Sequence, residues 1–461
     1  MKLSQFTLVV EDYPNPGEHL IYNTRTQALV KLDQKTKNIL DRLGASDFAP
    51  DFVEEERLKA LYRMGFIVKD QAEDDEKLAR FMEQKKYGVS DSKFHATILT
   101  TYNCNFACTY CFEESTRTSN QRLDRATSDL ILTWLKRKIE KLRMKRLIVD
   151  YYGGEPLLNQ SAIEYITPAL KEWCDARGVR FQMEIQTNGA LLTPDFVDKY
   201  LPYGLYEVQV SLDGVREVHD ANRPMRGSGA GTFDTVVKNL QAVADKVGLI
   251  VAAGYDKGDP QPLIDLIDHL DDIGLLKKLK KFIWSPVHPT LGPKGHADQV
   301  VSPGCLKNYD TDTLHGAETK IKQALEKKGI LMSSGLSASM CAVTSGERGV
   351  TIDTQGLIFK CNAMLGHPEL AVGDVREEEY NAQRQAFLAA EPWKECDSDC
   401  PYMPLCNTGC RLFGLFKKGD FMAKSCEKGY MDKFVPEAIK KEYELQLAAK
   451  QKQAKPKEAL V

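Results

Sequence analysis

Residues 101–112 read TYNCNFACTYCF, and this stretch decides the fold that we expect for the rest of the chain. Cys104, Cys108 and Cys111 are spaced C-x3-C-x2-C in a loop that directly follows a predicted strand, HATILTT. Thiolates bind iron and zinc well, and a closed structural site normally has four protein ligands. The next cysteine is Cys174, so the three thiolates would leave one metal position open for a substrate or cofactor. On spacing alone, a structural metal site is the alternative.

Strand and helix patterns alternate from this loop onward. Helical stretches such as SAIEYITPALKEWCDA and TFDTVVKNLQAVADKV lie between the strands. Strands joined by helices favour a parallel sheet with helices outside it, either a partial barrel or a doubly wound sheet. In both folds the ligand binds at the carboxyl ends of the strands, where the cysteine loop falls. Six strands are predicted, at HATILTT, RLIVDYY, VRFQMEIQT, LYEVQVSLD, GLIVAAGY and KFIWSPV.

The composition is that of a globular protein of 461 residues, enough for two or three domains. A formal net charge of -3 gives no bulk attraction to nucleic acid or anionic lipid. No apolar run reaches the roughly 18 residues that cross a bilayer, and the start, MKLSQFTLVVEDYPNPG, lacks the order of a signal peptide. We therefore expect a cytoplasmic protein without nucleic-acid or membrane partners. Disulfides are disfavoured there, so clustered cysteines indicate metal binding, whereas the isolated Cys174 indicates a buried structural thiol.

The cysteine loop and the motifs after the next strands together resemble the radical SAM (S-adenosylmethionine) superfamily. Tyr110 stands before the third cysteine, where the family has an aromatic residue beside the adenine. YYGGEPLL closes the second strand, and its Gly153, Gly154, Glu155 and Pro156 match the GGE motif that holds the SAM amino group. Glycines let a backbone approach a ligand closely, and a carboxylate suits an ammonium group.

Two further motifs, QTNGALL after the third strand and SLDG after the fourth, extend the resemblance. It implies that Ser211 contacts the SAM ribose or carboxylate, and that Arg223 in HDANRPMRGSG pairs with the carboxylate. The implied fold is a partial (β/α)6 radical SAM barrel. The implied chemistry is a [4Fe–4S] cluster on the three loop cysteines whose open iron binds SAM, followed by reductive cleavage to a 5′-deoxyadenosyl radical that abstracts hydrogen. Little acid–base machinery is needed, so no side chain is assigned a catalytic role.

Seven cysteines after the barrel resemble the SPASM extension, which binds two auxiliary [4Fe–4S] clusters. CDSDCPYMPLCNTGC is spaced C-x3-C-x5-C-x3-C, and GLIFKC supplies a G-x4-C. The family usually has two residues, rather than three, between the first two cysteines of that run, which puts the loop geometry in doubt. A zinc-binding tail is the alternative. By position, the ligands of the first auxiliary cluster are Cys341, Cys361 and Cys410, and those of the second are Cys396, Cys400, Cys406 and Cys426.

Cys305, in VSPGCLKN after the sixth strand, has three interpretations. It could be a fourth ligand of the first auxiliary cluster, a thiol that contacts the substrate, or a buried residue. Under the second interpretation, Cys305 is the candidate for a catalytic side chain, although no catalytic role is assigned.

The N-terminal residues predict a small winged-helix-like module. Its strands are QFTLVVED, HLIYN and TQALVKL, and Asp33 is placed to cap the helix that follows. A second helix, FVEEERLKALYRM, ends at Gly65, and FIV returns as a strand. HLIYNTRTQALVKLDQKTKNILDRL resembles the precursor-recognition domains of peptide maturases, which bind a leader peptide as an added strand. A structural extension is the alternative.

These patterns predict four segments. Residues 1–85 form the leader-recognition module and linker, 86–300 the barrel, 301–432 the SPASM domain, and 433–461 a charged tail that is a solvated helix or disordered.

The expected function is maturation of a ribosomally made precursor peptide, with an electron donor such as ferredoxin or flavodoxin. The resemblance is to the geopeptide group and the thioether-forming maturases. A sulfatase-type maturase that makes formylglycine is the alternative, but that family has Asp after the G-x4-C cysteine, and Asn362 here cannot accept a proton. Epimerisation and carbon–carbon crosslinking stay open. A non-catalytic multi-cluster or electron-transfer protein is the alternative of another class, and it would not cleave SAM.

Overall fold

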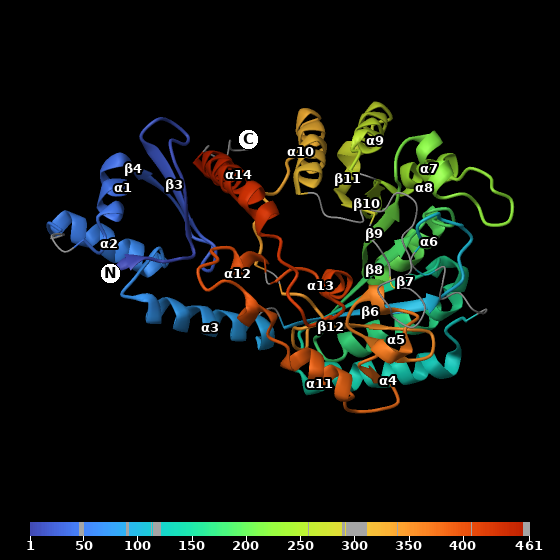
Figure 1. Cartoon of the computed structure of the whole chain (residues 1–461). Coiled ribbons are helices and arrows are strands. Elements are labelled where there is room, and N and C mark those ends of the chain that lie inside the picture. The colour runs from blue at the N-terminus through green and yellow to red at the C-terminus, as the bar shows by residue number, and fades with distance from the viewer. Residues whose placement is uncertain are drawn as a thin grey trace, which may run out of the picture. The chain divides into compact units, whose positions relative to one another are not determined.

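The computed structural model describes residues 1–45, 50–88, 92–111, 113, 121–256, 258–287, 291, 311–338, 340–406 and 408–454. The chain divides into two compact units (Figure 1). The smaller unit comprises Met1–Gly88, Leu331–Cys341 and Glu391–Val461, and the larger unit comprises Val89–Ile330 and Ala342–Ala390.

The larger unit is built on a sheet in the order β11-β10-β9-β8-β7-β6-β12-β13-β14. Six neighbouring strands run parallel: β6 (Lys93–Thr101), β7 (Arg146–Gly153), β8 (Arg180–Thr187), β9 (Leu205–Ser211), β10 (Gly248–Tyr255) and β11 (Leu279–Pro286). Their spatial order follows the chain without reversal, which is the arrangement of a partial barrel rather than a doubly wound sheet. The predicted fold class and all six predicted strands are confirmed.

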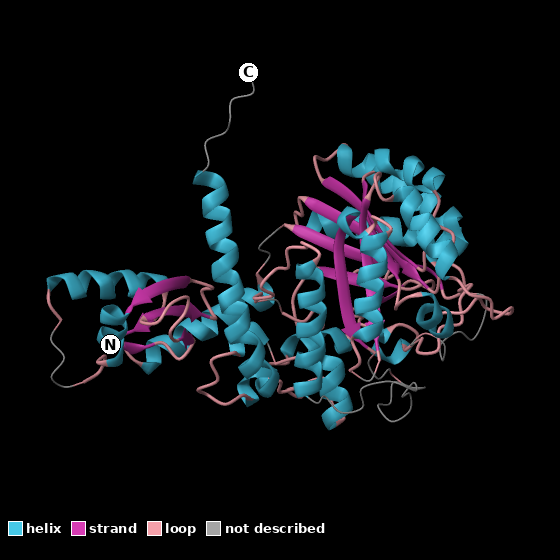
Figure 2. Ribbon diagram, turned by 90° about the horizontal axis from the view of Figure 1, so that it is seen from above, coloured by secondary structure: helices cyan, strands magenta, loops and turns pink. Residues whose placement is uncertain are grey.

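Helices connect the parallel strands, and Figure 2 shows the strands as a curved layer with helices packed along it. Asp124 caps the first of these helices, since its side chain accepts from Thr127 N at 2.7 Å. Two of the helices, α7 and α10, were not predicted. The helices are α4 (Arg125–Lys141), α5 (Gln160–Asp175), α6 (Pro194–Tyr200), α7 (Arg216–Asn222), α8 (Phe233–Val243), α9 (Gln261–Asp272) and α10 (Thr311–Lys327).

Strand β8 shows how the sequence places its two faces. Phe181, Met183 and Ile185 alternate along the strand and are buried, and α5 packs on this strand. The alternate residues are polar, and Gln186 among them lies opposite Gln209 of β9. Because successive side chains point to opposite faces, the apolar set covers the helix side and the polar set lines the inside of the curve.

A short extension follows the parallel strands in the larger unit. Strand β12 runs parallel to β6, and the next two strands continue antiparallel. The elements of the extension are β12 (Gly349–Ile352), β13 (Leu357–Phe359), η6 (Asn362–Met364), η7 (Pro368–Leu370), β14 (Gly373–Asp374) and α11 (Ala382–Ala389). Three further 3-10 turns lie among the parallel strands, at η2 (Pro156–Asn159), η3 (Leu201–Tyr203) and η4 (Leu276–Lys278).

The smaller unit contains a three-stranded antiparallel sheet in the order β2-β3-β4. Asp33 caps α1 by accepting from Thr36 N at 2.7 Å, and Gly65 ends α2 with a φ of 87°, so the predicted cap and helix end are confirmed. The elements are β1 (Lys2–Leu3), β2 (Thr7–Val10), β3 (Glu18–Asn23), β4 (Leu29–Asp33), β5 (Ile67–Val68), α1 (Gln34–Asp41), α2 (Phe52–Met64), α3 (Gln71–Tyr87), η8 (Pro392–Glu395), α12 (Met403–Cys406), α13 (Arg411–Lys418) and α14 (Lys428–Ala454).

Helix α3 occupies most of residues 70–92, the segment that the sequence predicts as a polar linker with room for part of a helix. Its Asp74 is fully buried and accepts from the Ser4 hydroxyl at 2.9 Å and from Gln5 N at 2.8 Å. These bonds fix the helix to the chain start, because a buried carboxylate is stable only when its oxygens are satisfied.

Helix α14 differs from the solvated or disordered tail that we expected. Val435 and Ile439 are fully buried, and with Met431 they pack in one core with Leu20 and Tyr22 of β3. The reason is the spacing of four residues between these apolar side chains, which places them on one face of the helix. The described part of the chain contains no helix that is both long and apolar enough to span a membrane.

Candidate functional site

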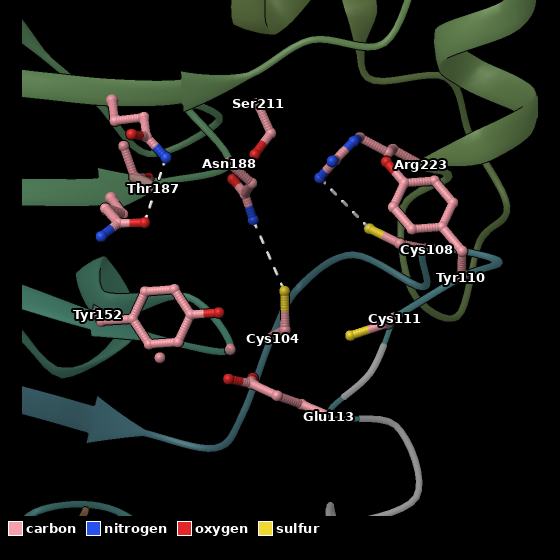
Figure 3. Close-up of a pocket in the computed structure, with 14 residues that line it drawn as sticks. Cys104, Cys108, Tyr110, Cys111, Glu113, Tyr152, Thr187, Asn188, Ser211 and Arg223 are labelled. Atoms are coloured by element: carbon pink, nitrogen blue, oxygen red, sulfur yellow. Dashed lines mark hydrogen bonds between the residues drawn. The ribbon is translucent and has the colours of Figure 1, made fainter. Parts of the chain in front are cut away.

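The three loop cysteines lie in one cavity of about 260 Å³ at the carboxyl ends of β6 to β9. Figure 3 shows the sulfur atoms of Cys104, Cys108 and Cys111 turned toward the same space. The cavity is lined by Cys104, Cys108, Tyr110, Cys111, Glu113, Tyr152, Gly153, Gly154, Gln186, Thr187, Asn188, Gln209, Ser211 and Arg223.

The two glycines after β7 allow the cysteine loop to pass directly over the strand end. A Cβ atom on Gly154 would lie within 3.0 Å of the carbonyl oxygens of Tyr102 and Asn103. The same backbone is held by a hydrogen bond from Glu155 N to Asn103 O at 2.8 Å. The glycine pair is therefore required by contact with the chain's own loop, in addition to any ligand.

The loop is also held from its other side by residues 222–226. Thr109 N donates to Asn222 O at 3.0 Å, and Arg226 N donates to Asn105 O at 2.7 Å. The guanidinium of Arg226 adds a bond from Nε to Cys104 O at 3.2 Å. Sequence reasoning did not single out Arg226, because nothing near it in the chain indicates a contact with a loop more than a hundred residues earlier.

Nitrogen donors point at the sulfur atoms of Cys104 and Cys108. Cys104 Sγ accepts from Phe106 N at 3.4 Å and from Asn188 Nδ2 at 3.7 Å. Cys108 Sγ accepts from Arg223 Nη1 at 3.8 Å (Figure 3). Such donors stabilise thiolates over thiols, so the residues present fit an anionic thiolate-bound cluster.

Arg223 is held by a carboxylate of its own chain. Its Nε lies 2.7 Å from Asp213 Oδ2 and its Nη2 lies 3.3 Å from Asp213 Oδ1. Burial raises the pKa of Asp213, but the charge of Arg223 and the hydrogen bonds to the carboxylate together outweigh burial, and the pKa lies below its ordinary value. Tyr110 donates its hydroxyl to the same carboxylate. The ion pair thus fixes Arg223 with Nη1 on the side of Cys108.

Glu155 and Pro156 are absent from the described lining of the cavity. The Glu155 side chain is fully buried and accepts from Asn188 N at 2.8 Å, Leu157 N at 3.0 Å and the Thr187 hydroxyl at 2.8 Å. Burial raises its pKa to about 7. The carboxylate ties the end of β7 to the end of β8, which fixes the backbone of the neighbouring glycines.

Sequence reasoning did not assign six of the lining residues. Four of them lie in the quoted motifs, but no role was assigned to them. The alternation of side chains along β8 and β9 could have identified Gln186 and Gln209, since it places both on the inner face with Ser211. The six residues are Glu113, Tyr152, Gln186, Thr187, Asn188 and Gln209.

The C-terminal cysteines fall in both units. Six of them, Cys341, Cys396, Cys400, Cys406, Cys410 and Cys426, belong to the smaller unit, and Cys361 follows β13 in the larger unit. Cys410 and Cys426 are exposed, and the other five are partly buried. The assignment of these cysteines to two clusters stays a prediction.

Cys174 and Cys305 are the two remaining cysteines of the chain. Cys174 is fully buried, and burial raises the pKa of its thiol to about 12, as expected for a structural residue. Cys305 lies outside the described residues.

A cavity at the carboxyl ends of parallel strands, lined by three thiols with donors aimed at the sulfur atoms of Cys104 and Cys108, defines an enzyme that carries a thiolate-bound metal cluster. The family model of the radical SAM superfamily matches residues 98–273. The mycofactocin maturase MftC of Mycolicibacterium smegmatis is 30% identical over 364 residues, which are 73% of this chain and 82% of that protein. The chain belongs to the radical SAM superfamily. Its cofactors are a [4Fe–4S] cluster and SAM, as the sequence predicted.

Two more comparisons agree with this assignment. The cysteine-type anaerobic sulfatase-maturating enzyme of Clostridium novyi is 24% identical over 67% of this chain and 85% of its own length. The crystal structure of Streptococcus suis SuiB bound to precursor peptide SuiA has a TM-score of 0.53 at 14% identity, over 92% of this chain and 99% of that one. At that identity the likeness shows the fold.

Proposed function

We propose that this protein modifies a ribosomally made precursor peptide by forming a thioether crosslink from a cysteine thiol to a carbon. The observation that carries the proposal is the thiol-lined cavity in a chain that is 30% identical to a peptide maturase over 82% of that maturase. The solved neighbour with a bound precursor peptide adds support. An electron donor of the ferredoxin or flavodoxin class would supply the reducing electron.

When bound, SAM and the [4Fe–4S] cluster would supply the hydrogen-abstracting radical chemistry, and an auxiliary cluster would accept the one electron left over. The thiol proton leaves to solvent as the carbon–sulfur bond forms. The chain's residues bind and orient. The Gly153 and Gly154 backbone and Ser211 line the cavity, and Arg223 presents the edge of its guanidinium that Asp213 does not occupy. We assign these groups and Tyr110 to SAM binding.

A formylglycine-generating activity is the second candidate, because the match to the sulfatase-maturating relative covers 85% of that relative's length. The residue after Cys361 argues against it. Asn362 Oδ1 accepts from the Thr351 hydroxyl at 2.6 Å, and an amide in this position cannot take a proton from a substrate. The mass of the product separates the two activities, since a formylglycine and a thioether differ in composition.

We further propose that the leader of the precursor adds to the free edge of β4. Strand β4 is an edge strand of its sheet. Asn23 N donates to Ala28 O at 3.0 Å, and bonded pairs alternate along an antiparallel ladder. The main-chain groups of Leu29 and Lys31 therefore point away from β3. An extended peptide can pair with such groups.

The edge proposal predicts that Lys31→Pro slows precursor modification roughly tenfold or more at low precursor concentration, because the leader no longer concentrates the core peptide at the active site. Proline removes an outward main-chain N–H, and edge strands tolerate it. The control is Lys31→Ala, which loses only an exposed ion pair with Glu18. Rates are followed by product mass. Equal rates for the two variants and the native protein would remove the edge as the docking site.

A further inference from the structure

Arg411 is a buried cation whose hydrogen-bond acceptors are all neutral. It is 1% exposed and begins α13 directly after Cys410. Its Nη1 donates to Ala423 O at 2.9 Å, and its Nη2 donates to the Thr408 hydroxyl at 2.9 Å and to Gly409 O at 3.2 Å. No carboxylate forms an ion pair with it among the described residues. A buried guanidinium in this setting needs a negative charge from another source.

Two donors in the same region have no hydrogen-bond acceptor in the described protein. They are Arg411 Nε and the hydroxyl of Ser425, which is fully buried. The segments that carry them are packed together, since Ser425 N donates to Thr408 O at 3.0 Å. Buried donors are rarely left without an acceptor, so a pair of them in one place points to an acceptor that is not a protein group.

Both donors stand next to cysteines of the predicted ligand sets. Arg411 directly follows Cys410, a predicted ligand of the first auxiliary cluster. Ser425 is followed directly by Cys426, a predicted ligand of the second auxiliary cluster. Thiolates bound to an iron–sulfur cluster, and the cluster's own sulfides, are anionic hydrogen-bond acceptors of the kind these two donors lack.

We propose that Arg411 is a positioning residue that compensates the negative charge of an auxiliary [4Fe–4S] cluster held by the cysteines of the smaller unit, and that Arg411 Nε and Ser425 Oγ donate hydrogen bonds to its sulfur atoms. A nearby cation and hydrogen bonds to sulfur both favour the reduced, more negative cluster. The two residues therefore raise the reduction potential of this cluster. The inference rests on the auxiliary-cluster part of the proposed function and is independent of which peptide is modified.

The test is a potentiometric titration, followed by electron paramagnetic resonance, of the full-length protein reconstituted anaerobically with iron and sulfide. Signals that change when SAM is added belong to the Cys104–Cys111 loop and serve as an internal standard. Arg411→Met should lower the midpoint potential of a signal that does not respond to SAM. The equilibrium constant for reduction should fall at least tenfold, which for one electron is a shift of about 59 mV. Arg411→Lys should recover part of the shift. Lys418→Met removes an exposed cation from the same helix, and its shift should be small because exposed charges are screened.

Ser425→Ala keeps the proposal testable if Arg411→Met does not fold. The hydroxyl has no protein partner, so its removal should leave the melting temperature of the cluster-free protein unchanged while lowering the same midpoint. Unchanged midpoints in Ser425→Ala, and in Arg411→Met if it folds, with full iron content would overturn the inference and leave the proposed function standing. A native protein that holds iron only at the Cys104–Cys111 loop would instead overturn the auxiliary-cluster assignment.

Discussion

Replacing Gly154 with alanine is expected to abolish assembly of the cluster at the Cys104–Cys111 loop, and with it all cleavage of SAM. The new Cβ would lie within 3.0 Å of the Tyr102 and Asn103 carbonyl oxygens, which are backbone atoms and cannot rotate away. The loop must move, at a cost on the order of 1–3 kcal/mol for the overpacking. Displaced thiolates no longer converge on one cluster. Iron content and the loss of the SAM-sensitive resonance signal measure the effect.

The matched control is Gly316→Ala in α10. Nothing lies within 4 Å of a Cβ at that position, so the variant should keep its iron and gain slightly in stability. Because the cysteines of the smaller unit are remote in sequence from Gly154, their iron should persist in the Gly154 variant. A Gly154→Ala protein that assembles the cluster and cleaves SAM at the native rate would show that the close approach of loop and strand is not required.

The second large effect is expected for Cys108→Ala, which should reduce 5′-deoxyadenosine formation to the level seen without enzyme. The substitution removes one of three thiolates that line the cavity, together with the sulfur that accepts from Arg223. Two thiolates cannot hold a [4Fe–4S] cluster with a single open iron. The measurement is chromatographic detection of 5′-deoxyadenosine after anaerobic incubation with SAM and a strong reductant.

Cys174→Ala is the control for this variant. It also removes a thiol, but this thiol is fully buried in α5 and does not line the cavity. It should lose some stability and keep SAM cleavage. Native levels of 5′-deoxyadenosine from the Cys108 variant would mean that the loop cysteines do not bind the reactive cluster.

Much of the larger unit could be predicted because its signals are local. Each parallel strand is a short β-rich run bounded by turn residues, and the three cysteines are spaced within eight positions of the chain. The contacts that fix the site are not local. Asp213 meets Arg223 across a turn and a helix, and Glu155 accepts from Asn188 just after the end of the next strand. Sequence patterns give the residue types there, whereas the partners follow only from the fold.

In the smaller unit, too, the sequence does not show which residues contact one another. The Lys- and Glu-rich composition of α14 indicates a solvated helix, yet its Met431, Val435 and Ile439 stripe covers the N-terminal sheet. The stripe was visible in the sequence, but nothing local showed which surface it covers. Arg411 carries no sequence signal either, since a single arginine after a cysteine is usually exposed.

The packing of α14 also decides how leader recognition should be tested. Deleting the first 85 residues would expose Val435 and Ile439, which are fully buried against β3 in the intact protein. Loss of activity in such a truncation would report misfolding as readily as loss of leader binding. A substitution that changes only the outward edge of β4 avoids this ambiguity, because the core side of the sheet stays as it is.

We expect the thiol-lined cavity to cleave SAM reductively in order to oxidise a peptide. This is tested by 5′-deoxyadenosine formation by the native full-length protein, reconstituted anaerobically and given SAM, a reductant and a candidate precursor peptide. We expect 5′-deoxyadenosine that depends on both SAM and the reductant, with loss of two hydrogen atoms from the precursor for each crosslink formed. A protein that holds its full complement of iron at the Cys104–Cys111 loop and forms no 5′-deoxyadenosine under these conditions would contradict it.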